Sequence, residues 1–240
     1  MIDWLLRKPA DPAIDLAGRE LPVAIRRHKR AKRMTLRLAP DGSEVRLTMP
    51  HWGRTSDALD FAARRRDWLE AQLAKLPRTC PPMPGGTISY RGNGLFVEWA
   101  AAAPRKPVLD GAAIRLGGPP DKIARRLQRW LESAALELML ADLAGYCAAA
   151  GRDVPRLRLS RAQRRWGSCA GDGTIRVNWR LVQAPDPVRR SVVAHEVAHL
   201  AHFDHGPAFH ALLGEIFEGE IAEANRWLKA HGRSLYSAFG

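Results

Sequence analysis

Short segments of alternating hydrophobic and polar residues mark the first fifty positions of the chain. Residues 34–38 and 45–49 alternate in this way on either side of Asp41-Gly42, which is a turn signal. An apolar run at 21–25 precedes them and leads into a strongly basic segment. We therefore expect residues 20–50 to form a β-hairpin.

Helical spacing of apolar residues follows at about 54–76, where Thr55 or Ser56 is a suitable N-cap. Prolines and glycines then crowd residues 77–86, which predicts a loop or linker. Beyond this loop the pattern predicts three short strands, at 87–90, 95–99 and 113–116.

The second half of the chain has mostly helical periodicity. A long helix opens at Pro119-Pro120-Asp121 and is expected to run to about residue 150. The segment 157–169 is extended, and a turn at Asp172-Gly173 leads it into a strand at 174–179. Three more helices are predicted, at 187–203, 207–217 and 219–231.

This order of elements predicts an α+β fold. We expect a β-rich N-terminal region with one helix over residues 1–118, and a mainly helical domain with a small antiparallel sheet over residues 119–240. No internal repeat is visible in the sequence.

Composition places the chain among ordinary globular proteins, with 46% hydrophobic and 26% charged residues in 240. Its three cysteines, Cys80, Cys147 and Cys169, are widely spaced and predict neither a disulfide framework nor a cysteine metal site. The apolar stretch at 1–6 is too short for a signal peptide, and no run of about eighteen apolar residues predicts a membrane span. We therefore expect a cytoplasmic protein in a reducing compartment, with no membrane partner.

The net charge of +13 has two interpretations. It favours association with nucleic acid, nucleotides or an anionic membrane, because charge of one sign attracts the opposite sign over long range. An arginine-rich composition throughout the chain explains the same number without any partner. The densest basic segment lies at 26–33, close to Trp52, so a nucleic-acid contact is expected there if anywhere.

The motif His-Glu-x-x-His at 195–199 carries the main chemical signal. Two histidines four residues apart lie over one another on a helix, so both imidazoles can reach one zinc ion. Glu196 lies beside the first ligand, where it can take a proton from water instead of binding the metal. Eight histidines in the chain leave some risk that the motif arises by chance, as two solvated histidines on a helix.

A catalytic zinc needs a third protein ligand, and His205 is the strongest candidate. It lies in Phe203-Asp204-His205-Gly206-Pro207, whose Asp, Gly and Pro favour ending the helix and folding the chain back. His202 suits a helix C-terminus better, and His210 falls in the next helix. The spacing also fits the metzincin pattern, but His202 replaces its glycine and no methionine follows Met139, which excludes that family.

Four segments together resemble the YgjP-like metallopeptidase family, which is akin to the SprT and WLM zinc metallopeptidases. They are Arg164-Arg165-Trp166-Gly167-Ser168-Cys169, Ile175-Arg176-Val177-Asn178-Trp179-Arg180-Leu181, His195 to Leu200, and His205-Gly206-Pro207-Ala208-Phe209. Asp204-His205-Gly206 stands where the family usually has Asn-His-Ser, which leaves the histidine in place. The specific similarity covers residues 156–210, and the N-terminal region resembles the family loosely.

The resemblance implies a zincin-like metallopeptidase domain that binds Zn²⁺ through His195, His199 and His205. It also implies that Glu196 is the catalytic glutamate. The expected activity is hydrolysis of a peptide amide. The strand at 166–169 is a possible edge for pairing with a peptide, although burial of Trp166 and Cys169 in the core is the more common arrangement.

Two other functions fit the same residues. The first is metal-dependent nucleotide phosphohydrolysis, in which arginines near the motif would bind phosphates; these are Arg161, Arg164, Arg165, Arg189 and Arg190. A solvated basic face is the more ordinary explanation of any one of them. The second is a DNA-associated protein with a structural zinc, which would require a fourth protein ligand to close the site.

Overall fold

The structure is a computed structural model that describes residues 12–39, 41–75 and 80–239. The chain divides into two compact units, Met1–Arg78 and Thr79–Gly240. The division therefore lies at 78/79 and not at the expected boundary near residue 118, because the strands after residue 86 share a core with the C-terminal helices. The apolar stretch at 1–6 lies outside the described residues.

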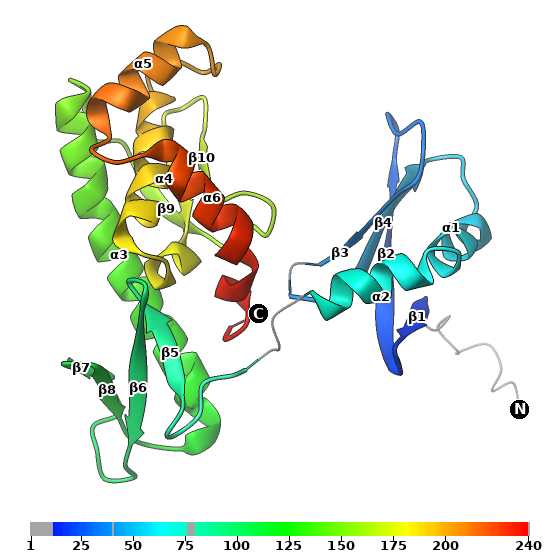
Figure 1. Cartoon of the computed structure of the whole chain (residues 1–240), viewed down its shortest axis with the longest axis horizontal. Helices are drawn as coiled ribbons and strands as arrows, with labels where there is room; N and C mark the ends of the chain where they lie inside the picture. Colours follow the sequence, from blue (N-terminus) through cyan, green and yellow to red (C-terminus); the bar gives the residue numbers. More distant parts are fainter. Residues whose placement is uncertain (1–11, 40, 76–79, 240) are drawn as a thin grey trace, which may run out of the picture. The chain divides into compact units, whose positions relative to one another are not determined.

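The first unit is a four-stranded sheet with two helices on one face (Figure 1). Its strands are β1 (Ala13–Leu16), β2 (Arg19–His28), β3 (Thr35–Leu38) and β4 (Val45–Pro50), in the order β1-β2-β4-β3. The helices are α1 (Thr55–Ala63) and α2 (Arg66–Ala74). Alternate strand residues such as Val23, Val45 and Leu47 face Ala58, Ala62 and Leu69 of the helices and are fully or almost fully buried.

Strand pairing in this unit differs in part from the expected hairpin. Strands β3 and β4 pair antiparallel across Asp41-Gly42, which confirms that turn. Strand β2, however, runs parallel to β4 and lies on its other side. Alternation identifies strands but does not fix which of them are neighbours, so the sequence alone could not give this order.

The helix expected at about 54–76 is broken into two. Residues 64–65 form a turn, and Arg65 leaves helical geometry at φ −112° and ψ 19°. Next to the break, the Arg66 guanidinium donates a 2.8 Å hydrogen bond to the backbone oxygen of Asp15 in β1. Helix α1 begins at Thr55, but its N-cap is Arg54 and no side chain caps it, so the N-cap prediction was wrong.

The second unit begins with another four-stranded sheet. It consists of β5 (Thr87–Tyr90), β6 (Asn93–Trp99), β7 (Val108–Asp110) and β8 (Ala113–Leu116), in the order β5-β6-β8-β7. Three of these strands confirm the sequence prediction, while β7 and, in the first unit, β1 were not predicted. Each four-strand sheet contains an antiparallel pair, then a parallel pair, then an antiparallel pair, so a repeat that the sequence does not reveal is present in the topology.

The first hairpin turn has the same backbone geometry in both four-stranded sheets. Ala17 and Gly18 join β1 to β2 with φ of 52° and 78°, and Arg91 and Gly92 join β5 to β6 with φ of 51° and 82°. Positive φ at both central residues is the geometry of a type I′ hairpin, which matches the right-handed twist of the strands. Gly92 also approaches Pro185 closely, since a Cβ there would lie 3.0 Å from the proline ring.

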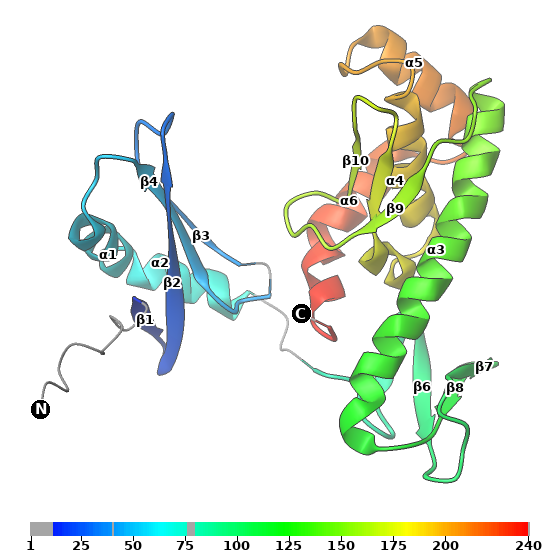
Figure 2. The same ribbon diagram turned by 180° about the vertical axis from the view of Figure 1, so that it is seen from behind.

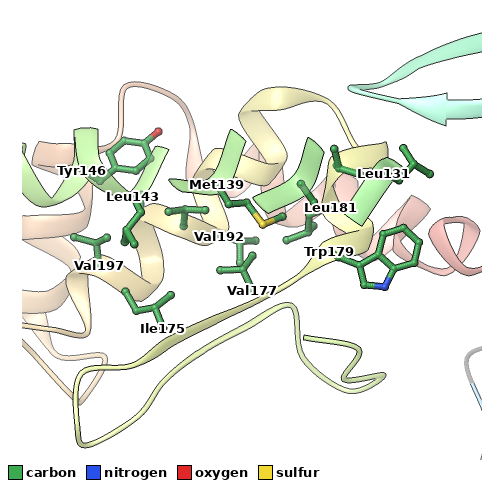
Figure 3. Close-up of a cluster of buried hydrophobic side chains, with 14 of the residues drawn as sticks. Leu131, Met139, Leu143, Tyr146, Ile175, Val177, Trp179, Leu181, Val192 and Val197 are labelled. Carbon is green, nitrogen blue, oxygen red and sulfur yellow. The ribbon is translucent and has the colours of Figure 1, made fainter. Parts of the chain in front are cut away.

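The long helix α3 (Ile123–Ala149) follows a short 3₁₀ turn, η1 (Pro120–Lys122), and confirms the expected helix to about residue 150. Buried residues recur every third or fourth position along it, which gives one apolar stripe. Figure 3 shows side chains of this stripe facing others from β11 (Ile175–Asn178), η2 (Trp179–Gln183) and α4 (Asp186–Ala198). This core supports the C-terminal sheet and the helix α4, which carry the sequence motifs described above.

The C-terminal sheet has three strands, β9 (Leu157–Ser160), β10 (Gly167–Cys169) and β11, in the order β10-β11-β9. Strands β10 and β11 pair antiparallel across Asp172-Gly173, but β9 pairs parallel with β11. The sheet is therefore mixed and not antiparallel throughout, because residues 161–166 carry the chain from one side of β11 to the other. The last helices, α5 (Pro207–Ile216) and α6 (Ile221–His231), lie where the periodicity predicts them, and η3 (Gly232–Tyr236) follows (Figure 2).

A chain of ion pairs fixes the start of α4. Arg91 in the β5–β6 turn binds Asp186 at 2.9 Å, and Asp186 also contacts Arg189. Arg189 in turn binds Asp142 of α3 at 2.8 Å, and its side chain is only 3% exposed. The first turn of the helix that carries the His-Glu-x-x-His motif is thus tied both to the β5–β6 turn and to α3.

Candidate metal centre

Three histidines converge at the C-terminal end of α4. His195 lies in its last turn, His199 is the residue that caps it, and His205 precedes Gly206, the N-cap of α5. One ring nitrogen from each lies within 4.8 Å of the others, and no other such group of three metal-binding side chains occurs among the described residues. The Nε2 atoms of His195 and His205 are 3.2 Å apart. Two nitrogens bound to one zinc at about 2.05 Å with tetrahedral angles lie about 3.3 Å apart, so this spacing suits a shared ion.

A hydrogen bond sets the orientation of His199. Its Nδ1 lies 2.9 Å from the backbone oxygen of His202, an acceptor, so Nδ1 carries the proton and donates. The Nε2 atom then keeps a free lone pair that can bind a metal ion. Bonds of this kind from the far side of an imidazole are the usual way in which proteins orient metal-binding histidines.

Phe209 of α5 packs against all three imidazoles. Its ring centroid lies 4.9 Å from that of His195, 4.6 Å from His199 and 4.8 Å from His205. The side chain is fully buried, so it forms an apolar support on which the three rings rest. In the sequence, Phe209 is visible only as the last residue of the segment His205-Gly206-Pro207-Ala208-Phe209, two residues after Pro207.

The turn after α4 brings His205 back to the helix. The helix was expected to reach residue 203, but regular α-structure ends at Ala198, and Leu200 and Ala201 donate tighter bonds to residues three before them. Gly206 is extended and Pro207 opens α5, which confirms the break expected from these residue types. His202 and His210 lie outside the group of three.

Burial and neighbouring charge favour the neutral form of the first histidine. Burial, followed by the charges of His199, His205 and His210, lowers the pKa of His195 to about 4. A neutral imidazole is the form that binds a metal. The donor set of three imidazole nitrogens fits a borderline divalent cation such as zinc.

Glu196 is buried on the flank of the same helix turn and is 5% exposed. Burial raises its pKa to about 7, while the Cys169 amide and the charge of Arg165 oppose that shift. Its Oε2 atom has no hydrogen-bond partner among the described residues. A buried carboxylate oxygen without a partner is costly, so this atom is available to a group that enters from outside the chain.

Strand β10 approaches this carboxylate closely. A Cβ on Gly167 would lie 2.4 Å from Oε1 of Glu196, so a larger residue here would require the Glu196 side chain or the strand to move. Strand β10 is also an edge strand, since β11 pairs with one side of it only. Apart from the glycine between Trp166 and Ser168, no local sequence pattern indicates this contact.

Trp166 and Asn178, from the other motif segments, make packing and hydrogen-bond contacts that hold the segments around β10. Trp166 is half-buried and packs on Tyr236 with ring centroids 5.9 Å apart, and burial raises the pKa of the Cys169 thiol. Asn178 is fully buried, donates to the backbone oxygen of Ala162 at 2.8 Å and accepts from the Arg180 amide. Trp166 therefore packs as expected, and Asn178 holds the chain that leads into β10.

Three of the five arginines that flank the motif form ion pairs, and the other two are exposed. Arg189 is buried between Asp142 and Asp186, so it does not form part of a solvated basic face. Arg190 pairs with Glu218, and Arg161 pairs with Glu132 at 2.8 Å. Arg164 and Arg165 are exposed.

The sequence matches the family described as "YgjP-like, metallopeptidase domain" over residues 32–231. No curated protein and no solved structure matches it significantly. No helix among the described residues is long and apolar enough to cross a membrane. Since the family match covers most of the sequence, the chain belongs to the YgjP-like metallopeptidase family.

Proposed function

We propose that this protein is a zinc metallopeptidase in which His195, His199 and His205 bind the ion and Glu196 is the general base. The observation that carries the proposal is the convergence of three imidazole nitrogens, within 4.8 Å of one another, next to a buried carboxylate with a free oxygen. Zinc held there would supply Lewis-acid polarisation of a substrate carbonyl and would make a water molecule more acidic.

The protein's own residues then have separate tasks. Glu196 takes a proton from the attacking water and returns it to the leaving amine. Gly167 allows β10 to lie against that carboxylate, and the free edge of β10 can pair with an extended peptide. Strand addition at this edge would bring the peptide's backbone next to Glu196, which supports an amide as the substrate.

The same features favour a catalytic over a structural metal. A structural zinc is closed by four protein ligands, whereas three candidate ligands meet here and no fourth joins them among the described residues. Nucleotide phosphohydrolysis receives less support, because Arg161, Arg189 and Arg190 are already engaged with carboxylates. No described contact of these arginines indicates nucleotide hydrolysis.

Glu196→Gln tests the proposal. The zinc-loaded variant should keep its metal and its fold and should lose amide hydrolysis by a factor of about 10² to 10⁴, because the general base is gone. Glu215→Gln, at an exposed position on α5, is the matched control and should be as active as the parent protein.

The assay compares an unfolded polypeptide with a nucleoside triphosphate under the same conditions. Cleavage of the polypeptide alone supports the proposal. Release of phosphate from the triphosphate that depends on Glu196, with no peptide cleavage, would replace it. Peptide cleavage that persists at the parent rate in the Glu196→Gln protein would refute the role of this carboxylate.

A further inference from the structure

The densest basic segment of the sequence lies in the first unit, apart from the residues of the metal centre. Residues 26–33 hold six Lys or Arg side chains and no acidic residue. Residues 1–78 contain seventeen Lys and Arg against ten Asp and Glu, which gives +7 of the total net charge of +13. We call the following five exposed side chains the basic patch: Arg26, Lys29, Arg30, Lys32 and Arg33.

These five charges are not neutralised locally. Within residues 12–39, 41–75 and 80–239, none of them has an ion-pair partner, whereas Arg46 and Arg66 of the same unit bind Glu44 and Asp15. A cluster of like charges destabilises the folded chain unless a partner of opposite charge is present. The patch therefore suits a polyanion.

An exposed tryptophan emerges beside the patch. Strands β2 and β4 run parallel with His28 opposite Pro50, so the chain leaves both strands at the same end of the sheet. Four residues of the patch, Lys29, Arg30, Lys32 and Arg33, follow β2 there, and Trp52 follows β4. Adjacent strands are about 4.8 Å apart, so the two segments start side by side. Trp52 is 73% exposed, which is unusual for so large an apolar side chain.

Arg27 fixes the turn that carries this tryptophan. Its guanidinium donates to the backbone oxygen of Gly53 and, at 3.0 Å, to Oγ1 of Thr55. Arg27 is not part of the basic patch, because its side chain lies on the helix-covered side of the sheet, on the same side as Met49. The exposed indole is thus presented from a held turn and not from a loose loop.

The sheet face next to the patch is basic and has no helix on it. Arg26, Arg37 and Arg46 alternate with the buried residues of their strands, so they lie on the face opposite α1 and α2 (Figure 2). The residues between them on that face, Ala24, Thr35 and Thr48, are small. A flexible chain of phosphates could lie along this surface without steric hindrance.

We propose that the first unit binds single-stranded nucleic acid, with the basic patch contacting phosphates and Trp52 stacking on a base. Positive grooves with an exposed aromatic ring are the general solution for binding single strands without sequence preference. Membrane binding would require further apolar side chains to insert with the tryptophan. The neighbours of Trp52 do not supply them, since His51 and Arg54 are polar and exposed and Gly53 has no side chain.

The test uses the full-length protein and fluorescence anisotropy of labelled oligo(dT) and oligo(rU) of twenty nucleotides. Non-specific binding of this kind has a Kd on the order of 10⁻⁶ to 10⁻⁴ M and weakens with salt. If all five charges of the patch contact phosphates, log K should fall against log[salt] with a slope of about −3.5, from ~0.7 per contact on a single strand. Binding to either oligonucleotide with this behaviour supports the proposal.

Two kinds of variant separate charge from stacking. Lys29→Ala with Arg30→Ala should make the slope smaller by about 1.4, whereas Arg125→Ala with Arg129→Ala, exposed on α3, removes equal charge and should change little. Trp52→Ala should weaken binding about tenfold at an unchanged slope, and Trp52→Phe should restore most of it. Trp68→Ala, at another exposed tryptophan, should have no effect.

Three results would overturn the proposal. The first is an equal loss for the α3 pair, which would mean attraction to net charge alone. The second is unchanged affinity in Trp52→Ala. The third is binding to vesicles with anionic lipid headgroups that depends on Trp52, with no binding to either oligonucleotide. None of these readouts depends on hydrolysis, so failure of the proposed peptidase activity would leave this test intact.

Discussion

Replacement of Gly167 by alanine places one methyl group against the catalytic glutamate of the proposed site. The added Cβ would lie 2.4 Å from Oε1 of Glu196 and 2.8 Å from Cδ, whereas ordinary contacts begin at 3.4 Å. Either β10 or the carboxylate must therefore move by about 1 Å. The helix end that carries Glu196 is packed in the core, and β10 is held by β11, so neither can move without cost.

The size of the effect follows from this displacement. A shift of about 1 Å in a catalytic group can lower the rate about 100-fold, which corresponds to ~2.7 kcal/mol in the barrier. Overpacking of the contact should also lower the free energy of unfolding by about 1–3 kcal/mol. Zinc content should stay near that of the parent protein, because the three atoms nearest to the added methyl group all belong to Glu196 and none to a histidine.

Peptide cleavage, zinc content and urea denaturation of Gly167→Ala would be measured together. Gly171→Ala is the matched control, because a Cβ at Gly171 meets no atom within 4 Å in the turn between the same two strands. We expect the control to behave like the parent protein in all three measurements. A folded, zinc-loaded Gly167→Ala protein with parent activity would refute the argument that this glycine sets the position of Glu196.

Further predictions concern the metal, the core and the ion pairs. His205→Ala should lose bound zinc on dialysis, measured by elemental analysis, while His210→Ala should keep it. F209A should lower the free energy of unfolding by about 3–5 kcal/mol in urea, because it removes a buried ring. Arg189→Ala should cost about 3–5 kcal/mol in the same measurement, because it removes the buried partner of Asp142, which then keeps only a 3.6 Å contact with Arg190.

Acid should weaken one of these ion pairs in a defined range of pH. Burial alone would raise the pKa of Asp186, but hydrogen bonds from Arg91 and the charge of Arg189 lower it below its usual value. A carboxyl group with a lowered folded pKa stabilises the protein above its unfolded pKa of about 3.9 and loses this effect as pH falls through the folded value. The stability difference between the parent protein and Asp186→Asn should be constant near neutral pH and should shrink as the pH falls below the unfolded pKa of about 3.9.

Periodicity in the sequence was enough to predict most helices and strands. The apolar stripe of α3 and the alternation in β3, β4 and β6 come from contacts between near neighbours in the chain, which the sequence displays directly. The order of strands depends on distant contacts, and here prediction failed. The parallel pairings of β2 with β4 and of β9 with β11 are of this kind, as is the repeat of topology between the two four-stranded sheets.

In the candidate site too, the local features were predictable from the sequence and the long-range contacts were not. Spacing of four residues predicted the pairing of His195 with His199, and breaker residues predicted the return of the chain at His205. The contact of Gly167 with Glu196 joins a strand to a helix far along the chain, and no local pattern contains it. Phe209 was likewise visible as a motif letter, but its contact with three imidazoles exists only in the folded structure.

The coordination of zinc in the purified protein can be measured by X-ray absorption at the zinc edge. We predict three imidazole nitrogens at about 2.0–2.1 Å and one oxygen from solvent, with no sulfur ligand. The His205→Ala protein should lose one of these nitrogens or the metal itself. A spectrum with a sulfur ligand, or with four protein ligands that leave no position for solvent, would contradict the proposal of an open three-histidine centre.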